Sequence, residues 1–406
     1  MHHLNEIIKE LIHRKKAGLP PITLLAVCPN SSAVLEAAVN AAARNRSVML
    51  FAATLNQVDF EASYTGWTPQ EFVGELHGYA EQYHWSGPLY PCLDHGGPWL
   101  KDLHTLAHFS YAESMEKVKT SISYCLDAGY QLLHIDPTVD RSLPAGQPLP
   151  LEMVVERTVE LIAHAEHVRH SSGLPELAYE VGTEEVHGGL VKIQRFEEFI
   201  NMLHKELRNN NLEACWPCLL VAQVGTDLHT TTFQPKVAQQ LFHIVSPYGS
   251  LIKGHYTDWV EKPQDYPTSG MGAANVGPEF TATEFEALQE LEGQEIKSDL
   301  QISDSRFMYT LEMAVIQSGR WKKWLLPEEK EVVFDQLSPS RKAWLLKTGS
   351  RYIWTNPDVV AARGRLYSNL RQMGIDAQTY VIGQITKVIE RYIQAFNLVD
   401  SIDLFR

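Results

Sequence analysis

Three histidines of the 406-residue chain stand at or just after the ends of short apolar runs. His95 ends LYPCLDH (89–95), His255 ends GSLIKGH (249–255), and His229 follows CLLVAQVGT (218–226). Three imidazoles with an open coordination position are typical of a catalytic Zn²⁺ or another divalent metal, which polarises a carbonyl group. The alternative is that each histidine only caps its own turn. A metal site requires that the fold bring the three together.

An acidic residue precedes the first of these histidines. Asp94 and His95 are followed at once by Gly96, Gly97 and Pro98. Because adjacent residues of a regular strand point to opposite faces, both side chains can serve one site only if the strand ends or bulges at this pair. Other polar residues and one glycine stand at comparable run ends, and we predict that they bind substrate or take part in catalysis: Asn56, Gln57, Asp136, Glu180, Glu184, Asp258, Asn275 and Gly277.

Eight short apolar runs must position these residues. They span 22–28, 47–53, 89–95, 130–136, 177–183, 218–226, 249–255 and 270–277. Most are continuous rather than alternating, which suits parallel strands covered on both faces. Helical patterns lie between them, except after His255, where the connection is irregular. Eight such units within about 250 residues favour an α/β fold of the (β/α)₈ TIM-barrel type. A doubly wound open sheet is the alternative.

Several helix starts are visible as capping-box patterns. Thr68 with Glu71, Ser110 with Glu113, and Thr281 with Glu284 follow the Ser/Thr-x-x-Glu pattern. Beyond about residue 295 no comparable strand-like run appears, and Trp, Tyr and basic residues become frequent. We therefore predict a barrel over 1–295, opened by a short amphipathic helix, and a helical C-terminal region over 296–406 packed on it.

The bulk composition bounds the class of protein. The formal charge of −14 argues against nucleic acid or an anionic membrane as the main partner, because such binding needs clustered Lys and Arg. A phosphorylated metabolite needs only a local positive site. No apolar run is long enough to span a membrane, and the N-terminal segment lacks the apolar core of a signal peptide. Five scattered cysteines predict no disulfide framework, and we expect a cytoplasmic protein.

Three other features favour plainer interpretations. The single CWPC motif (215–218) predicts core packing, and HAEHVRH (164–170) predicts a solvated helix face. Lys253 shares strand parity with His255, so a Schiff-base role is conceivable, although a buried lysine is rare.

Taken together, these stretches resemble the metal-dependent class II ketose-bisphosphate aldolases. The chain is more similar still to their relative, the non-catalytic (stabilising) subunit of D-tagatose-1,6-bisphosphate aldolase. The similar stretches run in the same order over most of residues 22–290: VLEAAV, TLNQV, YTGWTP, DHGGP, HIDPTVD, VGTE, GHYTDW and VGPEFT. The tail is less similar and centres on SRYIW (350–354).

The resemblance implies roles for particular residues. His95, His229 and His255 would hold the metal, and Asp94 would shuttle the proton of the ketose C4 hydroxyl during C3–C4 cleavage. Glu180 or Glu184 would act as an additional ligand or proton relay.

The loop after His255 departs from the class II pattern. The aldolases have a Gly/Ser-rich loop there whose backbone N–H groups bind a phosphate. Here the sequence is HYTDWVEKPQDY, which is acidic at Asp258, Glu261 and Asp265. A phosphate would need another binding group, for instance Arg351 or Lys253.

Two hypotheses follow from different classes. In the first, the protein performs metal-dependent aldol or retro-aldol chemistry on a ketose or ketose phosphate, as an aldolase or a C4-epimerase. In the second, it is a non-catalytic subunit that stabilises a partner class II aldolase. The sequence leaves the oligomeric state open, with a homo-oligomer among the options.

Overall fold

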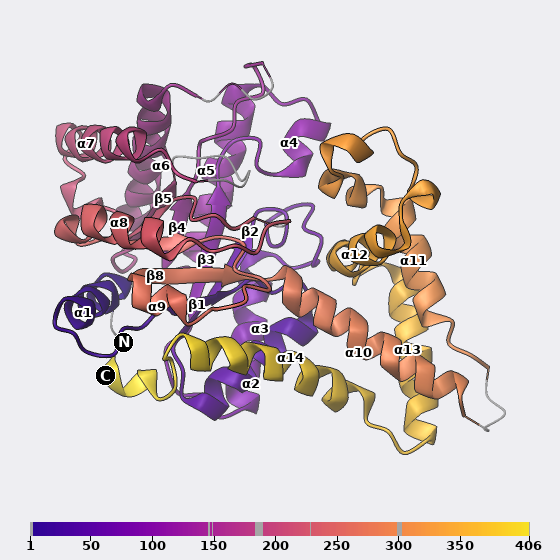
Figure 1. Ribbon diagram of the computed structural model, residues 1–406. Coiled ribbons are helices and arrows are strands. Elements are labelled where there is room, and N and C mark those ends of the chain that lie inside the picture. The colour runs from indigo at the N-terminus through magenta and orange to yellow at the C-terminus, as the bar shows by residue number, and fades with distance from the viewer. Residues whose placement is uncertain are drawn as a thin grey trace.

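The computed structural model describes residues 3–144, 147, 149–182, 190–227, 229–298 and 303–405. Its centre is a closed barrel in which all eight strands are parallel and are hydrogen-bonded in chain order (Figure 1). The strands are β1 (Leu24–Val27), β2 (Met49–Thr54), β3 (Tyr90–Gly96), β4 (Leu132–Ile135), β5 (Ala178–Gly182), β6 (Leu219–Val221), β7 (Leu251–Gly254) and β8 (Met271–Val276). The predicted (β/α)₈ barrel is confirmed, because pairing of β1 with β8 excludes an open sheet.

Helices alternate with the strands and cover the outside of the barrel (Figure 1). They are α1 (Leu4–Lys16), α2 (Ser32–Asn45), α3 (Pro69–Gln82), α4 (Asp102–Leu106), α5 (Tyr111–Asp127), α6 (Leu151–Ser171), α7 (Ile193–Asn209), α8 (Pro235–Val245) and α9 (Asp265–Ser269). Only the short α9 follows β7, which is the irregular connection expected from the sequence. Because helices cover the outer face and side chains fill the interior, nearly every strand residue is buried.

The helix starts show which sequence signals are decisive. Thr68 with Glu71 and Ser110 with Glu113 form the predicted capping boxes at α3 and α5. The box predicted at Thr281 is wrong, because α10 (Pro278–Ile296) begins earlier, at the proline after Gly277. A proline at the first helical position fixes φ and loses no hydrogen bond there, so it sets the helix start.

The end of β3 is irregular at Asp94 and His95, the pair for which the sequence predicts a strand end or a bulge. His95 has φ of +52°, and the register between β3 and β4 shifts between Leu93 and Gly96. This break lets Asp94 and His95 turn toward the same side. A Cβ on Gly97 would lie 1.8 Å from the carbonyl oxygen of Asp136, so the segment needs glycine at this position.

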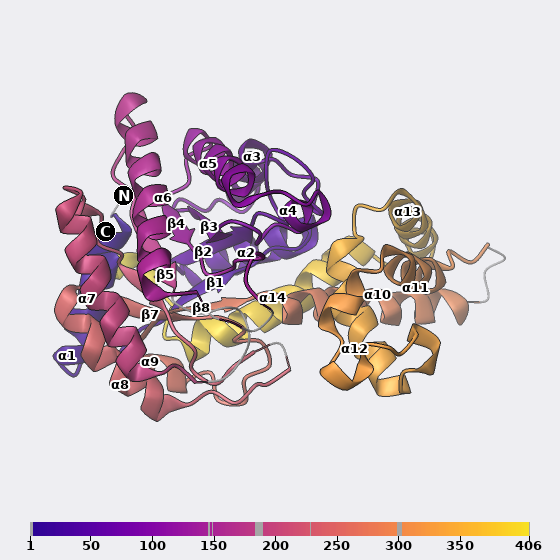
Figure 2. The same ribbon diagram turned by 90° about the horizontal axis from the view of Figure 1, so that it is seen from above.

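The chain beyond β8 is helical throughout its described part. α10 leaves the carboxyl end of β8 and leads to α11 (Phe307–Ser318), α12 (Pro339–Gly349) and α13 (Pro357–Gln372), which stand beside the barrel (Figures 1 and 2). The short 3₁₀ helices η3 (Arg320–Trp324) and η6 (Ser350–Tyr352) lie among them. Helix α14 (Ala377–Ala395) then returns along α10 and packs on α2. The division into two units at residue 295 stays a prediction.

The two ends of the chain lie close together on the side of the barrel where the strands begin (Figure 1). The backbone N–H of Thr23 donates to the carbonyl of Phe396, which ties the last helix to the entry of β1. Helix α1 buries Leu4, Ile7 and Leu11 on one face and ends in basic residues, as predicted. Among the described helices, none has the length and apolar character that crossing a membrane requires. All five cysteines are free, and Cys215 and Cys218 are buried in the core.

Candidate functional site

Four side chains converge at the carboxyl ends of three strands. They are Asp94 and His95 at the end of β3, His134 on β4, and His255 just after β7. Each offers a ligand atom, and these atoms all lie within 4.8 Å of one another. The ring centroids of His95 lie 4.8 Å from His134 and 4.6 Å from His255. Barrel enzymes carry their catalytic groups at this end of the strands.

A buried layer of charge supports the cluster from inside the barrel. The ammonium of Lys253 donates to both carboxylate oxygens of Glu180, at 2.7 and 3.0 Å, and lies 3.4 Å from Asp94 Oδ1. The three residues come from β7, β5 and β3, and barrel interiors are filled in layers by alternate strands. Here such a layer consists of charged groups instead of branched apolar ones. The amide of Asn275 donates to Asp94 Oδ2 at 3.0 Å and completes its environment.

The charge layer keeps the carboxylates ionised. Burial acts to raise the pKa of Asp94, but Lys253 and the nearby histidines outweigh it and hold this pKa well below its usual value. The same balance, with Lys253 as the main counter-charge, lowers the pKa of Glu180 to about 2. Lys253 itself is held as an ammonium, because its two carboxylate partners outweigh burial and raise its pKa.

His95 is oriented by a second carboxylate. Its Nδ1 lies 2.6 Å from Asp136 Oδ2, and Thr138 donates its hydroxyl to the other oxygen of Asp136 at 2.5 Å. A carboxylate on one ring nitrogen fixes the imidazole and leaves the opposite nitrogen for a ligand. Burial acts to lower the pKa of His95, but Asp94 and Asp136 raise it to about 9. For His255, burial prevails and lowers the pKa to about 4.

These residues fit a divalent metal. Three imidazoles and a carboxylate are the ligand types that Zn²⁺ prefers, with oriented histidine as in known zinc sites. His134 accepts from the backbone N–H of His95 at its Nδ1, whereas its Nε2 is buried and has no hydrogen-bond partner in the described part of the chain. The nitrogen of His134 that lies beside Asp94 Oδ1, at 3.3 Å, is Nδ1, and a histidine nitrogen binds a metal only in its unprotonated form.

His229 is not brought to the cluster, which corrects the predicted histidine triad. It is exposed on the loop after β6, and its ring stacks on Trp344 of α12 with centroids 5.0 Å apart. Strand β6 ends at Val221, earlier than the predicted run, so the intervening residues carry His229 out of the barrel. His134 lies beside the other two histidines instead. Its signal in the sequence was strand parity with Asp136, two residues later on the same run.

The other residues predicted from the sequence fall into distinct places. Glu180, Asp136 and Asn275 contact the cluster, as described above. The side chain of Asn56 bonds to the backbone of Leu100 and Asp102, and Gln57 bonds to the backbone of Thr54 and Pro29. Both amides therefore shape the loop after β2, and their substrate contact stays a prediction. Glu184 lies outside the described residues.

Asp258 and Gly277 meet at the start of α10. Asp258 Oδ1 accepts the backbone N–H of Gly277 at 3.0 Å and that of Glu279 at 2.8 Å. Burial raises the pKa of Asp258 to about 7, and the two N–H donors act in the opposite direction. The predicted acidic loop thus places one carboxylate directly on a helix N-terminus.

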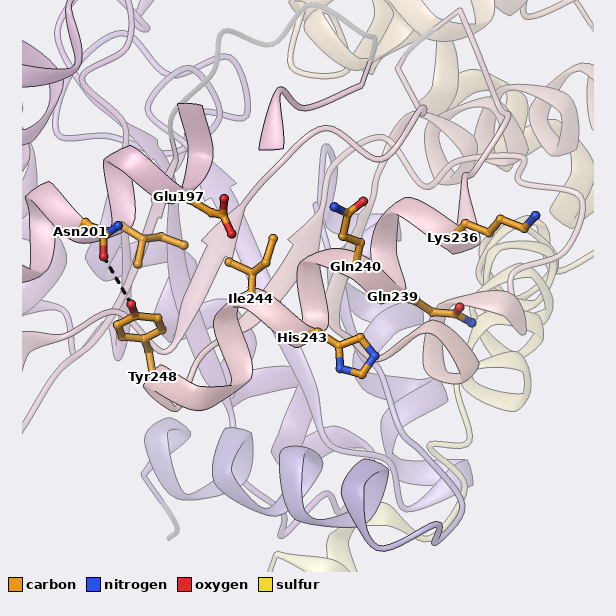
Figure 3. Close-up of a pocket in the computed structure, with 9 residues that line it drawn as sticks. Glu197, Asn201, Lys236, Gln239, Gln240, His243, Ile244 and Tyr248 are labelled. Carbon is orange, nitrogen blue, oxygen red and sulfur yellow. Dashed lines mark hydrogen bonds between the residues drawn. The ribbon is translucent and has the colours of Figure 1, made fainter. Parts of the chain in front are cut away.

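A separate pocket of ≈ 840 Å³ lies on the outer helical layer, between α7 and α8 (Figure 3). Glu197 and Asn201 of α7 and Lys236 and His243 of α8 are among the residues that line it, and the Tyr248 hydroxyl lies 3.5 Å from Asn201 Oδ1. It lies away from the strand ends, so we assign no catalytic role to it.

The fold is a closed (β/α)₈ barrel with a cluster of histidines and a carboxylate at the carboxyl ends of its strands. A family model described as D-tagatose-1,6-bisphosphate aldolase subunit GatZ/KbaZ-like matches residues 8–397. The chain therefore belongs to this family, whose chemistry is of the ketose-phosphate aldolase and epimerase type.

Individual relatives agree with this placement. A D-tagatose 6-phosphate 4-epimerase of Agrobacterium fabrum is 25% identical over 395 residues, covering 90% of this chain and 88% of that protein. A structure titled a probable tagatose 6 phosphate kinase, from Sinorhizobium meliloti 1021, matches with a TM-score of 0.75 at 21% identity, covering 92% of this chain and all of that one. The fructose-bisphosphate aldolase of Campylobacter jejuni matches with a TM-score of 0.58 at 11% identity, covering 98% and 96%. These two structural matches show the shared fold.

Proposed function

We propose that the protein catalyses reversible C3–C4 cleavage of a ketose phosphate and, by re-forming the bond on the other face of the aldehyde, epimerises C4. The observation that carries the proposal is the convergence of Asp94, His95, His134 and His255 within 4.8 Å at the barrel mouth. The relative that acts as a tagatose 6-phosphate 4-epimerase supports epimerisation as the outcome. An aldolase would use the same residues and release the two fragments.

His95, His134 and His255 would hold a divalent cation, with Asp94 beside them. When bound, such an ion polarises the ketose carbonyl and stabilises negative charge on its oxygen. We propose zinc, as predicted from the sequence, as the resident metal.

Asp94 is suited to act as the base. Lys253 keeps its carboxylate ionised, and the Asn275 amide on Oδ2 fixes its orientation. The carboxylate accepts the proton of the C4 hydroxyl as the C3–C4 bond breaks, and the bonding electrons pass toward C2, giving an enediolate and an aldehyde. After the aldehyde rotates, the bond re-forms and Asp94 returns the proton to the C4 oxygen. Glu180 binds the ammonium group of Lys253 and so positions the positive charge that keeps Asp94 ionised.

The test is a turnover assay with the purified chain and a pair of ketohexose 6-phosphates that differ only at C4. Interconversion followed by NMR is expected for the wild type and for Asp127→Asn, an exposed carboxylate at the end of α5. Asp94→Asn should lose at least about 10²-fold in kcat, the usual worth of a positioned acid–base group.

The alternative role, support of a partner aldolase, makes the opposite prediction. Activity would then appear only when a catalytic class II subunit is added, and it would survive Asp94→Asn in this chain. That result would replace the proposed function. The cytoplasmic location predicted from the sequence suits either role.

A further inference from the structure

A buried arginine of the C-terminal region has no counter-ion among the residues that the structure describes. Arg351 of η6 is 6% exposed, and in the described part of the chain no carboxylate forms an ion pair with it. Its guanidinium lies between the rings of Trp324 and Tyr352, at 4.7 and 4.8 Å from the ring centroids, and donates to the Tyr352 hydroxyl at 3.0 Å. Because an unpaired buried charge is costly, a guanidinium in this setting indicates an anion supplied by a ligand.

The surroundings of Arg351 are positive and rich in hydroxyl groups. Arg320 lies 4.3 Å above the Tyr352 ring, and both it and Lys323 bond to Asp102. The Tyr352 oxygen accepts from Arg351 and from the indole of Trp324, so its own proton is free for a ligand. In a chain of formal charge −14, this is a local positive site of the kind that a phosphate requires.

This positive site adjoins the barrel mouth. Tyr64 packs edge-on against Tyr352, with ring centroids 5.1 Å apart, and its hydroxyl donates at 2.6 Å to Asn30, which follows β1. The Arg351 site therefore adjoins the end of the barrel that carries the histidine cluster.

The place where barrel enzymes often bind phosphate is already filled. That place is formed by the loops after the seventh and eighth strands and a helix N-terminus. In this protein Asp258 takes the N–H groups of Gly277 and Glu279, and Glu279 Oε2 takes the N–H of Trp259 at 2.7 Å. Whether Asp258 is protonated or ionised, its side chain accepts the hydrogen bonds of these two N–H groups, so they are not open to a phosphate. They lie next to the reacting groups, since Asn275, two residues before Gly277, bonds to Asp94.

We propose that the substrate is a ketose monophosphate whose phosphate, remote from the carbonyl, binds Arg351 and Tyr352, while Asp258 excludes a phosphate beside the carbonyl. This inference rests on the proposed function and deepens it, because it selects a ketose 6-phosphate over a 1,6-bisphosphate. A phosphate on C1, one bond from the carbonyl carbon, would fall on the donors that Asp258 occupies. A phosphate on C6, which is remote from the carbonyl, would bind at Arg351 instead.

Calorimetric titration with inorganic phosphate tests the anion site without turnover. The wild type and Arg365→Gln, which removes an exposed arginine of α13, should bind phosphate equally. Arg351→Gln should bind at least about tenfold more weakly, as expected when one partner of a buried charged contact is truncated. Arg351→Lys, which keeps the charge, should show an intermediate affinity and guards against a folding defect. Equal affinity in all four proteins would overturn the proposal.

Kinetics then separate this proposal from the proposed function. Arg351→Gln should raise KM for the ketose 6-phosphate at least about tenfold. The exposed control Arg365→Gln should leave this KM unchanged. Asp258→Gly, which frees the N–H donors, should improve inhibition by a ketose 1,6-bisphosphate, whereas Asp258→Asn should not. If turnover is found but is indifferent to Arg351, this inference fails and the proposed function stands. If phosphate binds through Arg351 but no turnover is found, only the proposed function fails.

Discussion

At the scale of single residues, Lys253 sets the chemistry that the barrel mouth can perform. Its ammonium is fully buried and is bound by Glu180 and Asp94. A Schiff-base mechanism needs the free amine, whereas these carboxylates keep the proton on nitrogen. The structure therefore argues against the Schiff-base reading of Lys253. It gives the lysine a supporting role, that of keeping Asp94 ready to accept a proton.

Gly97 allows a test of the close contact between the segment after β3 and the segment after β4. Alanine at this position would place its Cβ 1.8 Å from the Asp136 carbonyl oxygen, so β3 and β4 would have to separate. We expect Gly97→Ala to lower the free energy of unfolding by about 3 kcal/mol. Gly74→Ala is the matched control, since nothing lies within 4 Å of its added Cβ and alanine is the better helix former. Urea denaturation of both variants measures the free energy of unfolding. Equal stabilities would contradict the predicted clash between the alanine Cβ and the Asp136 carbonyl.

The residues of the site were only partly predictable from the sequence. Asp94, His95 and His255 follow apolar runs directly, and a strand places such residues reliably at its end. His229 looked equivalent, but where β6 stops depends on pairing with β5 and β7, and the sequence of β6 alone does not fix it. His134 was missed because it stands inside its run, where a histidine resembles an ordinary core residue. Only closure of the barrel brings it to the others.

At the scale of elements, α4 links the barrel to the C-terminal region. Its first residue, Asp102, bonds to Arg320 and Lys323, so the short helix steadies the positive site around Tyr352. Within α4, the side chain of His104 is buried. Its Nδ1 accepts the backbone N–H of Trp99, which anchors the helix to the preceding loop. Burial, with help from Lys101, lowers the pKa of His104 to about 4, so the imidazole is neutral in the folded protein.

This neutral histidine predicts a loss of stability in acid. In the unfolded chain His104 takes up a proton below about pH 6.5, whereas in the folded protein it does so only near pH 4. Stability is therefore lost as the pH falls from about 6.5 to 4, by about 2 kcal/mol at pH 5. In His104→Asn, whose amide oxygen replaces Nδ1, this share of the loss should be absent. Denaturation curves at pH 7 and pH 5 measure the difference, and parallel losses in both proteins would refute the assignment.

Elements were more predictable than residues, for a physical reason. A continuous apolar run that ends in glycine or a polar residue has few alternatives to a buried parallel strand, and all eight runs became strands. Helix starts follow local rules, but the rules compete. At α10 the proline of the first turn outranked Thr281, which lies inside the helix. Local capping patterns cannot decide such a competition by themselves.

At the scale of the whole molecule, helix α14 near the end of the chain contacts the loop after β7 and the start of α10. The hydroxyl of Tyr392 in α14 donates to Glu279 Oε2 at 2.5 Å and lies 3.1 Å from the carbonyl oxygen of Thr257. Arg391 bonds to the same carboxylate at 2.6 Å. Because Glu279 belongs to α10 and Thr257 follows β7, helix α14 holds the start of α10 against the loop that carries His255 and Asp258.

Tyr392→Phe tests this connection. It removes a buried hydroxyl from a charged acceptor, so we expect the free energy of unfolding to fall by about 2 kcal/mol. Tyr380→Phe on the same helix also loses a bond to a carboxylate, that of Glu290, but at an exposed position where the cost should stay under about 0.5 kcal/mol. Thermal or urea unfolding of the pair provides the comparison. A smaller loss in Tyr392→Phe than in Tyr380→Phe would show that α14 does not secure these loops.

The central claim is that His95, His134 and His255 form one metal site beside Asp94, and its most direct test is the metal content of three proteins. The wild type, His134→Ala and His229→Ala would be loaded with Zn²⁺, dialysed, and analysed by elemental mass spectrometry. The structure predicts about one bound ion in the wild type and in His229→Ala, and a loss of at least about tenfold in affinity in His134→Ala. Metal retained by His134→Ala but lost from His229→Ala would contradict the account.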